Sequence, residues 1–170
     1  SSQLKPEEIG YLHVTRIQQD GKVLSAFENE TVLEVTLAKA IAPGGKASFE
    51  LEFDGQTPLQ IRRSGRNNSE GIDYSMSQWY PKMCEYDTRG WHANPYVGRE
   101  FYGVWGDFEV NVTIDKKYVL AGTGVLQNAN EIGCGYAPEN SKLKPQSGDK
   151  NTWHFKANNV HDFVWAADPD

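Results

Sequence analysis

Hydrophobic and polar residues alternate along four stretches of the chain, as they do in β-strands with one face in a core and the other in solvent. The four stretches are residues 11–17, 31–37, 48–53 and 107–114. No segment of ten or more residues repeats its apolar positions with the period of an α-helix, so no long helix is expected. The pattern therefore predicts an all-β chain.

Turn-forming residues divide the first half of this pattern into two hairpins. Asp20-Gly21 is a strong turn signal, and residues 23–27 are predicted to return from it as a strand. Pro43-Gly44-Gly45 separates residues 31–37 from residues 48–53, which are predicted to pair as a second hairpin with one face in solvent. The residues predicted to face inward in that hairpin are Leu33, Val35, Leu37, Phe49, Leu51 and Phe53.

The second half of the chain returns to the strand pattern after a long irregular region at residues 56–104. Strands are predicted at residues 107–114, 118–126, 153–157 and 162–167. Asp115-Lys116-Lys117 predicts the turn between the first two, and residues 127–150 form a long excursion. Strands at this spacing predict a mostly antiparallel β-sandwich with long aromatic-rich loops. A length of 170 residues fits a single domain over residues 1–170.

Composition narrows the classes of partner. A net charge of −6 disfavours nucleic acid, because phosphate binding needs a basic surface. The run Arg62-Arg63-Ser64-Gly65-Arg66 is interpreted as a solvated loop. No apolar run approaches the roughly 18 residues that span a bilayer, so no transmembrane segment is predicted. Cys84 and Cys134 are either one disulfide of an exported protein or two free thiols, and the compartment stays open.

The chain's nucleophiles and metal-ligating residues form no known catalytic motif. The four histidines form no His-Glu-x-x-His pattern and are interpreted as loop and strand-face residues, with His154 and His161 on different strands. A metal site from His92, Cys84 and a carboxylate is the weaker alternative, because its spacing matches no common zinc pattern. No Gly-x-Ser-x-Gly motif or phosphate-binding loop is present. We therefore predict no catalytic residue, no metal site and no cofactor in this segment.

Aromatic residues are concentrated between positions 79 and 105. They are Trp79, Tyr80, Trp91, Tyr96, Phe101, Tyr102 and Trp105. Two interpretations are open: a ligand-binding surface such as those of sugar-binding sandwiches, or a small core that anchors long loops. We favour the core, because irregular loops lack ladder hydrogen bonds and need buried anchors.

A set of motifs in the same region resembles the N-terminal β domain of M1-family zinc aminopeptidases, in a form typical of the bacterial subgroup. The motifs are Gln78-Trp79-Tyr80-Pro81-Lys82, Tyr86-Asp87, Gly90-Trp91, Glu100-Phe101-Tyr102, Gly106-Asp107-Phe108-Glu109-Val110, Tyr118-Val119 through Thr123-Gly124, and Asp162-Phe163-Val164-Trp165-Ala166-Ala167-Asp168. The resemblance implies that Gln78 helps to bind the free α-amino group of a peptide substrate. Many members have an acidic residue where this chain has Tyr80. The resemblance therefore implies that Tyr80 lies at the substrate site but does not supply the negative charge of those members.

The resemblance also implies what surrounds the segment. The parent would be a zinc-dependent aminopeptidase whose catalytic domain holds the zinc and follows in the same chain, and an exported or periplasmic location for it stays open. The segment itself would be inactive, would bind the catalytic domain and the peptide N-terminus, and would lack the family's first strands upstream of Gly10. Two alternatives stay open: a non-catalytic module that binds carbohydrate or protein through Trp79, Trp91 and Trp105, and a structural domain of a member whose catalytic domain has decayed.

Overall fold

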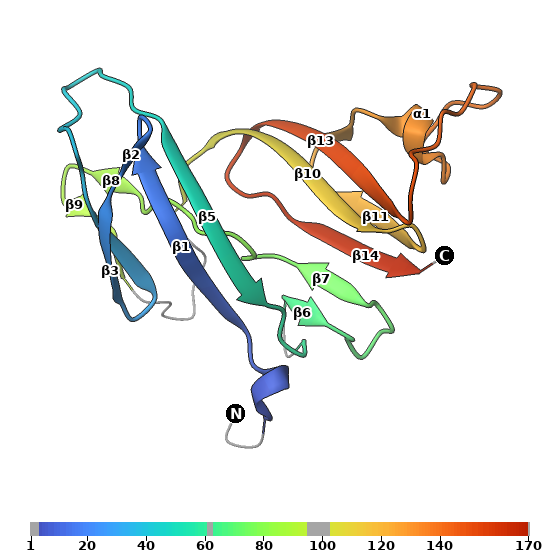
Figure 1. Cartoon of the computed structure of the whole chain (residues 1–170), viewed down its shortest axis with the longest axis horizontal. Coiled ribbons are helices and arrows are strands. Elements are labelled where there is room, and N and C mark those ends of the chain that lie inside the picture. Colours follow the sequence, from blue (N-terminus) through green and yellow to red (C-terminus); the bar gives the residue numbers. More distant parts are fainter. Residues whose placement is uncertain (1–3, 61–62, 95–102, 170) are drawn as a thin grey trace. The chain divides into compact units, whose positions relative to one another are not determined.

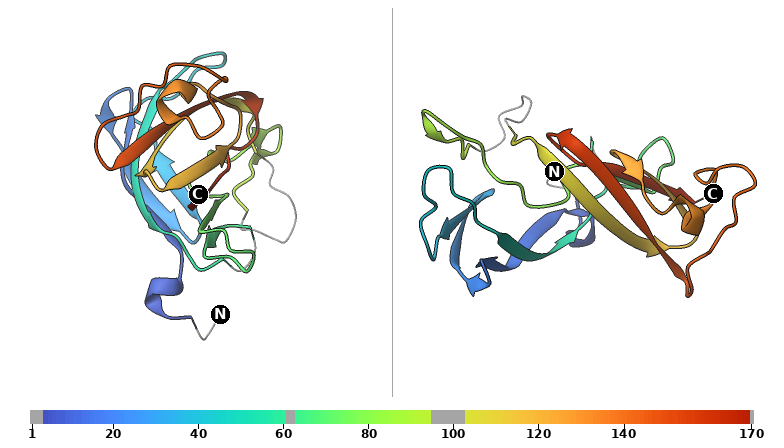
Figure 2. Two further views of the ribbon diagram at one scale, coloured as in Figure 1. Left: turned by 90° about the vertical axis from the view of Figure 1, so that its right-hand side faces the viewer. Right: turned by 90° about the horizontal axis from the view of Figure 1, so that it is seen from above.

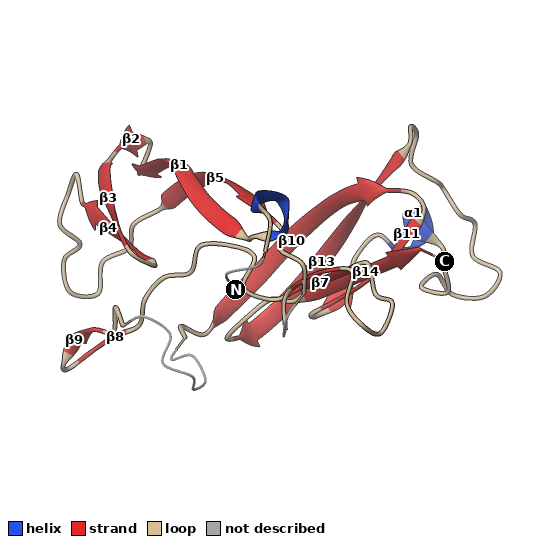
Figure 3. Cartoon of the chain, turned by 90° about the horizontal axis from the view of Figure 1, so that it is seen from below, coloured by secondary structure: helices blue, strands red, loops and turns tan. Residues whose placement is uncertain are grey.

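A computed structural model describes residues 4–60, 63–94 and 103–169. Strands dominate this part of the chain, as Figure 3 shows in red, and every pairing between named strands is antiparallel. The predicted all-β, antiparallel class is therefore confirmed. The helical segments are η1 (Pro6–Glu8) and α1 (Ala129–Ile132). Neither is long and apolar enough to cross a membrane as a helix.

Contacts divide the strands into two compact units. The sandwich unit comprises Ser1–Ile9, Thr57–Trp79 and Val104–Asp170, and the hairpin unit comprises Gly10–Gln56 and Tyr80–Gly103. The single domain over residues 1–170 stays a prediction.

The sandwich unit contains two sheets, with strand orders β10-β13-β12 and β11-β14-β7-β6 (Figure 1). The strands of the first sheet are β10 (Gly106–Asp115), β12 (Val125–Leu126) and β13 (Lys150–Val160). The strands of the second are β6 (Gly65–Arg66), β7 (Tyr74–Met76), β11 (Tyr118–Gly122) and β14 (Trp165–Pro169). The alternation predicted for residues 107–114 is confirmed, because every second residue of β10 from Phe108 to Ile114 is partly buried and the residues between are exposed.

Aromatic side chains fill the core between these two sheets. The buried cluster is Leu120, Ile132, Trp153, Phe155, Ala157, Phe163 and Ala167. The rings of Trp153 and Phe155 stack with their centroids 6.4 Å apart, and Phe163 meets Phe155 edge-on at 6.1 Å. Each ring buried in this way stabilises the fold by about 1.5–3 kcal/mol. Phe163 lies just before β14, so the core fixes the segment that leads into that strand.

The chain crosses from one sheet to the other at Thr123-Gly124. The predicted turn at residues 115–117 is present, but the single return strand at 118–126 is wrong. β11 pairs with β14, and only after this crossing does β12 pair with β13. Gly124 makes the crossing possible, because its φ of +86° is in the left-handed region and a Cβ there would lie 2.2 Å from the carbonyl oxygen of Lys156.

The hairpin unit consists of antiparallel strand pairs of different lengths. Its strands are β1 (Tyr11–Gln19), β2 (Lys22–Val23), β3 (Ser25–Asn29), β4 (Val32–Thr36), β5 (Phe49–Gln56), β8 (Tyr86–Asp87) and β9 (Gly90–Trp91). The turn between β1 and β2 is confirmed, with Asp20 at φ +48° and Gly21 at φ +80°. Positive φ at both positions is the geometry of a tight primed hairpin turn.

The second predicted hairpin, residues 31–37 with 48–53, is wrong. β4 pairs with β3 and β5 pairs with β1, whose long ladder is visible in Figures 1 and 2. Alternation identifies the face of a strand but not its partner, and Glu30 at φ +55° allows a closer turn for β4. The inward side of β5 is only partly covered, because Leu51 and Phe53 are 40% and 38% exposed. Leu37, at 41%, lies outside β4 and is not inward as predicted.

Candidate functional site

Gln78 lies two residues after the end of β7, on a segment of the sandwich unit that neighbouring hydrogen bonds fix. The Ser77 hydroxyl donates to the carbonyl of Arg63 at 3.2 Å, and the Ser64 hydroxyl donates to the carbonyl of Ser77 at 2.5 Å. Gln78 itself is exposed and has a φ of +56°. A left-handed conformation is uncommon for a residue with a side chain and costs about 1–2 kcal/mol, so the surrounding contacts must maintain it.

Trp79 anchors this segment to the core. Its indole N–H donates to the carbonyl of Phe163 at 3.0 Å, and its ring meets the ring of Trp165 edge-on at a centroid distance of 6.4 Å. Phe163 is fully buried. The backbone of Gln78 is therefore held between a serine network on one side and the buried residues around β14 on the other.

The Gln78 amide faces a carboxylate that the sequence analysis did not assign to the site. Its Nε2 donates to Oδ2 of Asp162 at 3.4 Å, and the other oxygen of Asp162 accepts the backbone N–H of Phe163 at 2.8 Å. Among residues 4–60, 63–94 and 103–169, none donates a hydrogen bond to Gln78 Oε1. The two side chains are 84 residues apart in the sequence, and no local pattern links them.

Tyr80 belongs to the hairpin unit, whereas Gln78 belongs to the sandwich unit. Tyr80 is partly buried, and the Nζ of Lys82 lies 5.3 Å from the centroid of its ring. This distance is within the range of a cation–π interaction. Each of the two predicted site residues is thus positioned by contacts in its own unit.

The other tryptophans of the predicted aromatic group differ from Trp79. Trp91 is 63% exposed and meets Tyr86 edge-on across the β8–β9 hairpin at 4.9 Å, and Trp105 is 62% exposed beside His161. The anchoring role is confirmed for Trp79 and is wrong for Trp91 and Trp105, because both of those rings are mostly exposed. Sequence predictions that lie outside the described residues concern Arg62, Tyr96, Glu100, Phe101 and Tyr102.

Three histidines are paired with carboxylates. His92 Nε2 lies 2.9 Å from Asp87 Oδ2, and this contact, with a hydrogen bond from the backbone N–H of Arg89, lowers the pKa of Asp87 below its ordinary value of 3.8. His154 Nε2 lies 2.8 Å from Glu109 Oε1 and likewise lowers the pKa of Glu109. The third is His13, which lies 2.9 Å from Glu28.

The placement of His161 corrects the sequence analysis. His154 is in β13 and His161 directly follows the same strand, so the two are not on different strands. Within the described part of the chain, no three His, Cys, Asp or Glu side chains are grouped so that they could bind a metal ion. Cys84 and Cys134 are both free thiols in the structure.

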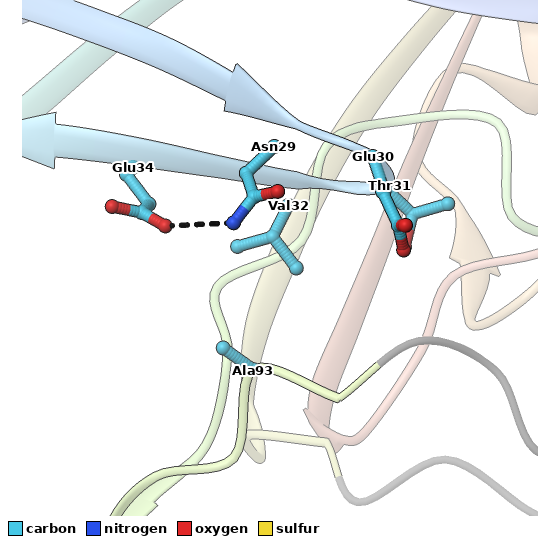
Figure 4. Close-up of a pocket in the computed structure, with 6 residues that line it drawn as sticks. All are labelled: Asn29, Glu30, Thr31, Val32, Glu34 and Ala93. Atoms are coloured by element: carbon cyan, nitrogen blue, oxygen red, sulfur yellow. Dashed lines mark hydrogen bonds between the residues drawn. The ribbon is translucent and has the colours of Figure 1, made fainter.

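A pocket of the hairpin unit lies at the β3–β4 turn (Figure 4). It is lined by Asn29, Glu30, Thr31, Val32, Glu34 and Ala93. The side chains of Asn29 and Glu34 point toward one another, and Asn29 Nδ2 donates to Glu34 Oε1 at 3.1 Å. Gln78 and Tyr80 are not among the lining residues.

Comparisons with known proteins gave no relatives: no protein-family model, no curated protein and no solved structure matches this chain. The resemblance to M1-family aminopeptidases therefore stays a prediction, and the geometry around Gln78 is the physical evidence on which a function can be argued.

Proposed function

We propose that this chain is the non-catalytic N-terminal domain of a zinc-dependent M1-family aminopeptidase, which removes N-terminal residues from peptides. In this proposal the chain supports the catalytic domain of the same protein and lines one side of its substrate site through Gln78, while a substrate role for Tyr80 stays a prediction. The observation that carries the proposal is the Gln78 amide: it is exposed on an anchored segment, with Nε2 directed to Asp162 and no described donor on Oε1.

The amide oxygen of Gln78 is the group that would bind substrate. An amide oxygen accepts hydrogen bonds from an ammonium group, which has three donors and no acceptor. Asp162 adds negative charge within 3.4 Å of the amide, which favours a cation nearby. In this proposal the zinc chemistry belongs to the catalytic domain, and this chain's part is to bind and orient the peptide N-terminus.

The experiment compares Gln78→Ala with wild type in the full-length protein, with L-alanine p-nitroanilide as the substrate. Loss of a hydrogen bond to a charged group should lower kcat/KM by about 1–3 kcal/mol, or roughly 5- to 150-fold. Thermal stability should change little, because the Gln78 side chain is exposed. Gln127→Ala is the matched control, since Gln127 is also exposed in the sandwich unit and its side-chain amide donates to the nearby carbonyl of Val125. Equal kcat/KM for all three proteins would contradict the role of Gln78, and wild type without aminopeptidase activity would contradict the proposed function.

A binding module is the second candidate, and the exposed pair Tyr86 and Trp91 supports it. Both rings are more than 60% exposed, at 62% and 63%, on one side of the β8–β9 hairpin. Aromatic faces of this kind bind sugars, but Trp79 is not available to such a surface because its indole N–H is bonded to Phe163. A glycan-binding screen read by tryptophan fluorescence, with Trp91→Ala as the variant, separates this candidate from the aminopeptidase.

A further inference from the structure

The Asp162 carboxylate has a fixed orientation, because its two oxygens have different partners. Oδ1 accepts the backbone N–H of Phe163 at 2.8 Å, and Phe163 is fully buried, so this contact is attached to the core. Oδ2 is thereby directed toward the Gln78 amide at 3.4 Å. The carboxylate links a rigid part of the sandwich unit to an exposed side chain.

A primary amide can rotate by half a turn and exchange its oxygen and nitrogen, so an exposed glutamine presents either an acceptor or a donor. A carboxylate accepts hydrogen bonds only, and it therefore selects the orientation in which Gln78 Nε2 faces Asp162. The same choice directs Oε1 away from Asp162. We propose that Asp162 is a positioning residue that holds the Gln78 amide with its oxygen available to the ammonium group of the substrate. This inference rests on the proposed function and goes beyond it by explaining how an exposed amide acts as an acceptor.

The contact with Phe163 makes Asp162→Asn an informative variant. The introduced asparagine can keep the backbone contact only through its amide oxygen, since the N–H of Phe163 needs an acceptor. Its NH₂ group then faces Gln78, which must turn its own oxygen inward and its NH₂ outward. An outward NH₂ cannot accept a hydrogen bond from an ammonium group, because both groups are donors. The variant should therefore lose substrate binding although its shape and its link to the core are retained.

A second change should restore the acceptor. In the double variant Asp162→Asn with Gln78→Glu, one carboxylate oxygen at position 78 accepts from the new asparagine and the other faces the ammonium group. The pair then has the same total charge as the wild-type pair, with the charge moved to position 78. A residue with only a structural role at position 162 would not be rescued by a change at position 78.

The test measures kcat/KM on L-alanine p-nitroanilide with the full-length protein. Asp162→Asn should lower kcat/KM at least tenfold, and the double variant should return to within about threefold of wild type. Asp107→Asn is the matched control, because Asp107 also accepts a backbone N–H, from Asn159 at 2.8 Å, and among the described residues no glutamine is bonded to its carboxylate. Unchanged kcat/KM in Asp162→Asn, or a loss that the double variant does not reverse, would overturn the inference.

A spectroscopic readout separates this inference from the proposed function. In ¹H–¹⁵N spectra, the side-chain NH₂ signals of Gln78 should move in Asp162→Asn and stay in place in Asp107→Asn. If wild type has no aminopeptidase activity, the proposed function fails and the substrate role of Asp162 fails with it, whatever the spectra show. If wild type is active but the Gln78 signals do not respond to Asp162→Asn, the inference alone fails.

Discussion

Replacing Gly124 with alanine tests the point at which the chain crosses between the two sheets of the sandwich unit. A Cβ at this position would lie 2.2 Å from the carbonyl oxygen of Lys156 and 2.7 Å from the Cβ of Ala157. Both neighbours belong to β13, the strand that pairs with β10 and β12. Since one of the close atoms is backbone, the crossing or the strand itself must move to accept the methyl group.

The cost has two parts that can be separated. The left-handed backbone, at φ +86°, costs a residue with a side chain about 1–2 kcal/mol. Overpacking against β13 adds about 1–3 kcal/mol. Alanine also restricts the unfolded chain more than glycine does, which offsets about 0.4–1 kcal/mol of the lost stability. The free energy of unfolding should therefore fall by about 1–4.5 kcal/mol.

Gly148→Ala is the matched control. Gly148 has a φ of +81°, and no atom lies within 4 Å of the position of its missing Cβ. The backbone cost and the unfolded-state term are therefore shared, and the difference between the two variants isolates the contact with β13. Urea unfolding followed by tryptophan fluorescence would measure both. Equal destabilisation by the two substitutions would refute the reasoning, because the close approach would then contribute nothing.

Three further outcomes are expected. Burial, and then the hydrogen bond of its hydroxyl to Asp73 at 3.0 Å, raises the pKa of Tyr118 from 10.0 to about 12. Between pH 10 and 12 the folded state therefore keeps a proton that the unfolded state loses, and the stability of wild type should fall as the pH rises. Thermal melts at alkaline pH should show this decline in wild type but not in Tyr118→Phe. Phe163→Ala should lower the free energy of unfolding by about 3–5 kcal/mol in urea, since the ring is fully buried; a loss under 1 kcal/mol would contradict the core described here. Metal analysis after dialysis against a weak chelator should find no stoichiometric zinc, and one tightly bound zinc per chain would contradict this prediction.

Local patterns predicted the strands better than their partners. The alternation from Phe108 to Ile114 was enough to predict β10 and its inward face, because the two-residue period of a strand appears within a short run of sequence. The pairing of β4 with β3 rather than β5 was not predictable in the same way. The choice of a pairing partner depends on distant segments and on turns such as the one at Glu30. Glu30 has a left-handed backbone conformation, which a glutamate in the sequence does not predict.

The site shows the same division. Gln78 was selected from a motif of adjacent residues, whereas Asp162 enters the site only because the fold brings it within 3.4 Å. Trp79 was correctly expected to anchor a loop, since irregular loops lack ladder hydrogen bonds and need buried anchors. The exposure of Trp91 and Trp105 was missed, because aromatic composition gives the same signal for a buried ring and an exposed one.

The place of β14 in its sheet has a consequence for how the protein is made. β14 lies between β11 and β7 and pairs with both, although it comes last of the strands in the chain. A ribosome adds about 5–20 residues per second, so β7 must wait roughly 4–18 s for the partner that fills the gap beside it. During that interval β7 has an open edge, as does β11 once it has been made, and open edges pair readily with other chains. Nascent chains of this protein are therefore expected to need protection by chaperones until Trp165–Pro169 has been synthesised.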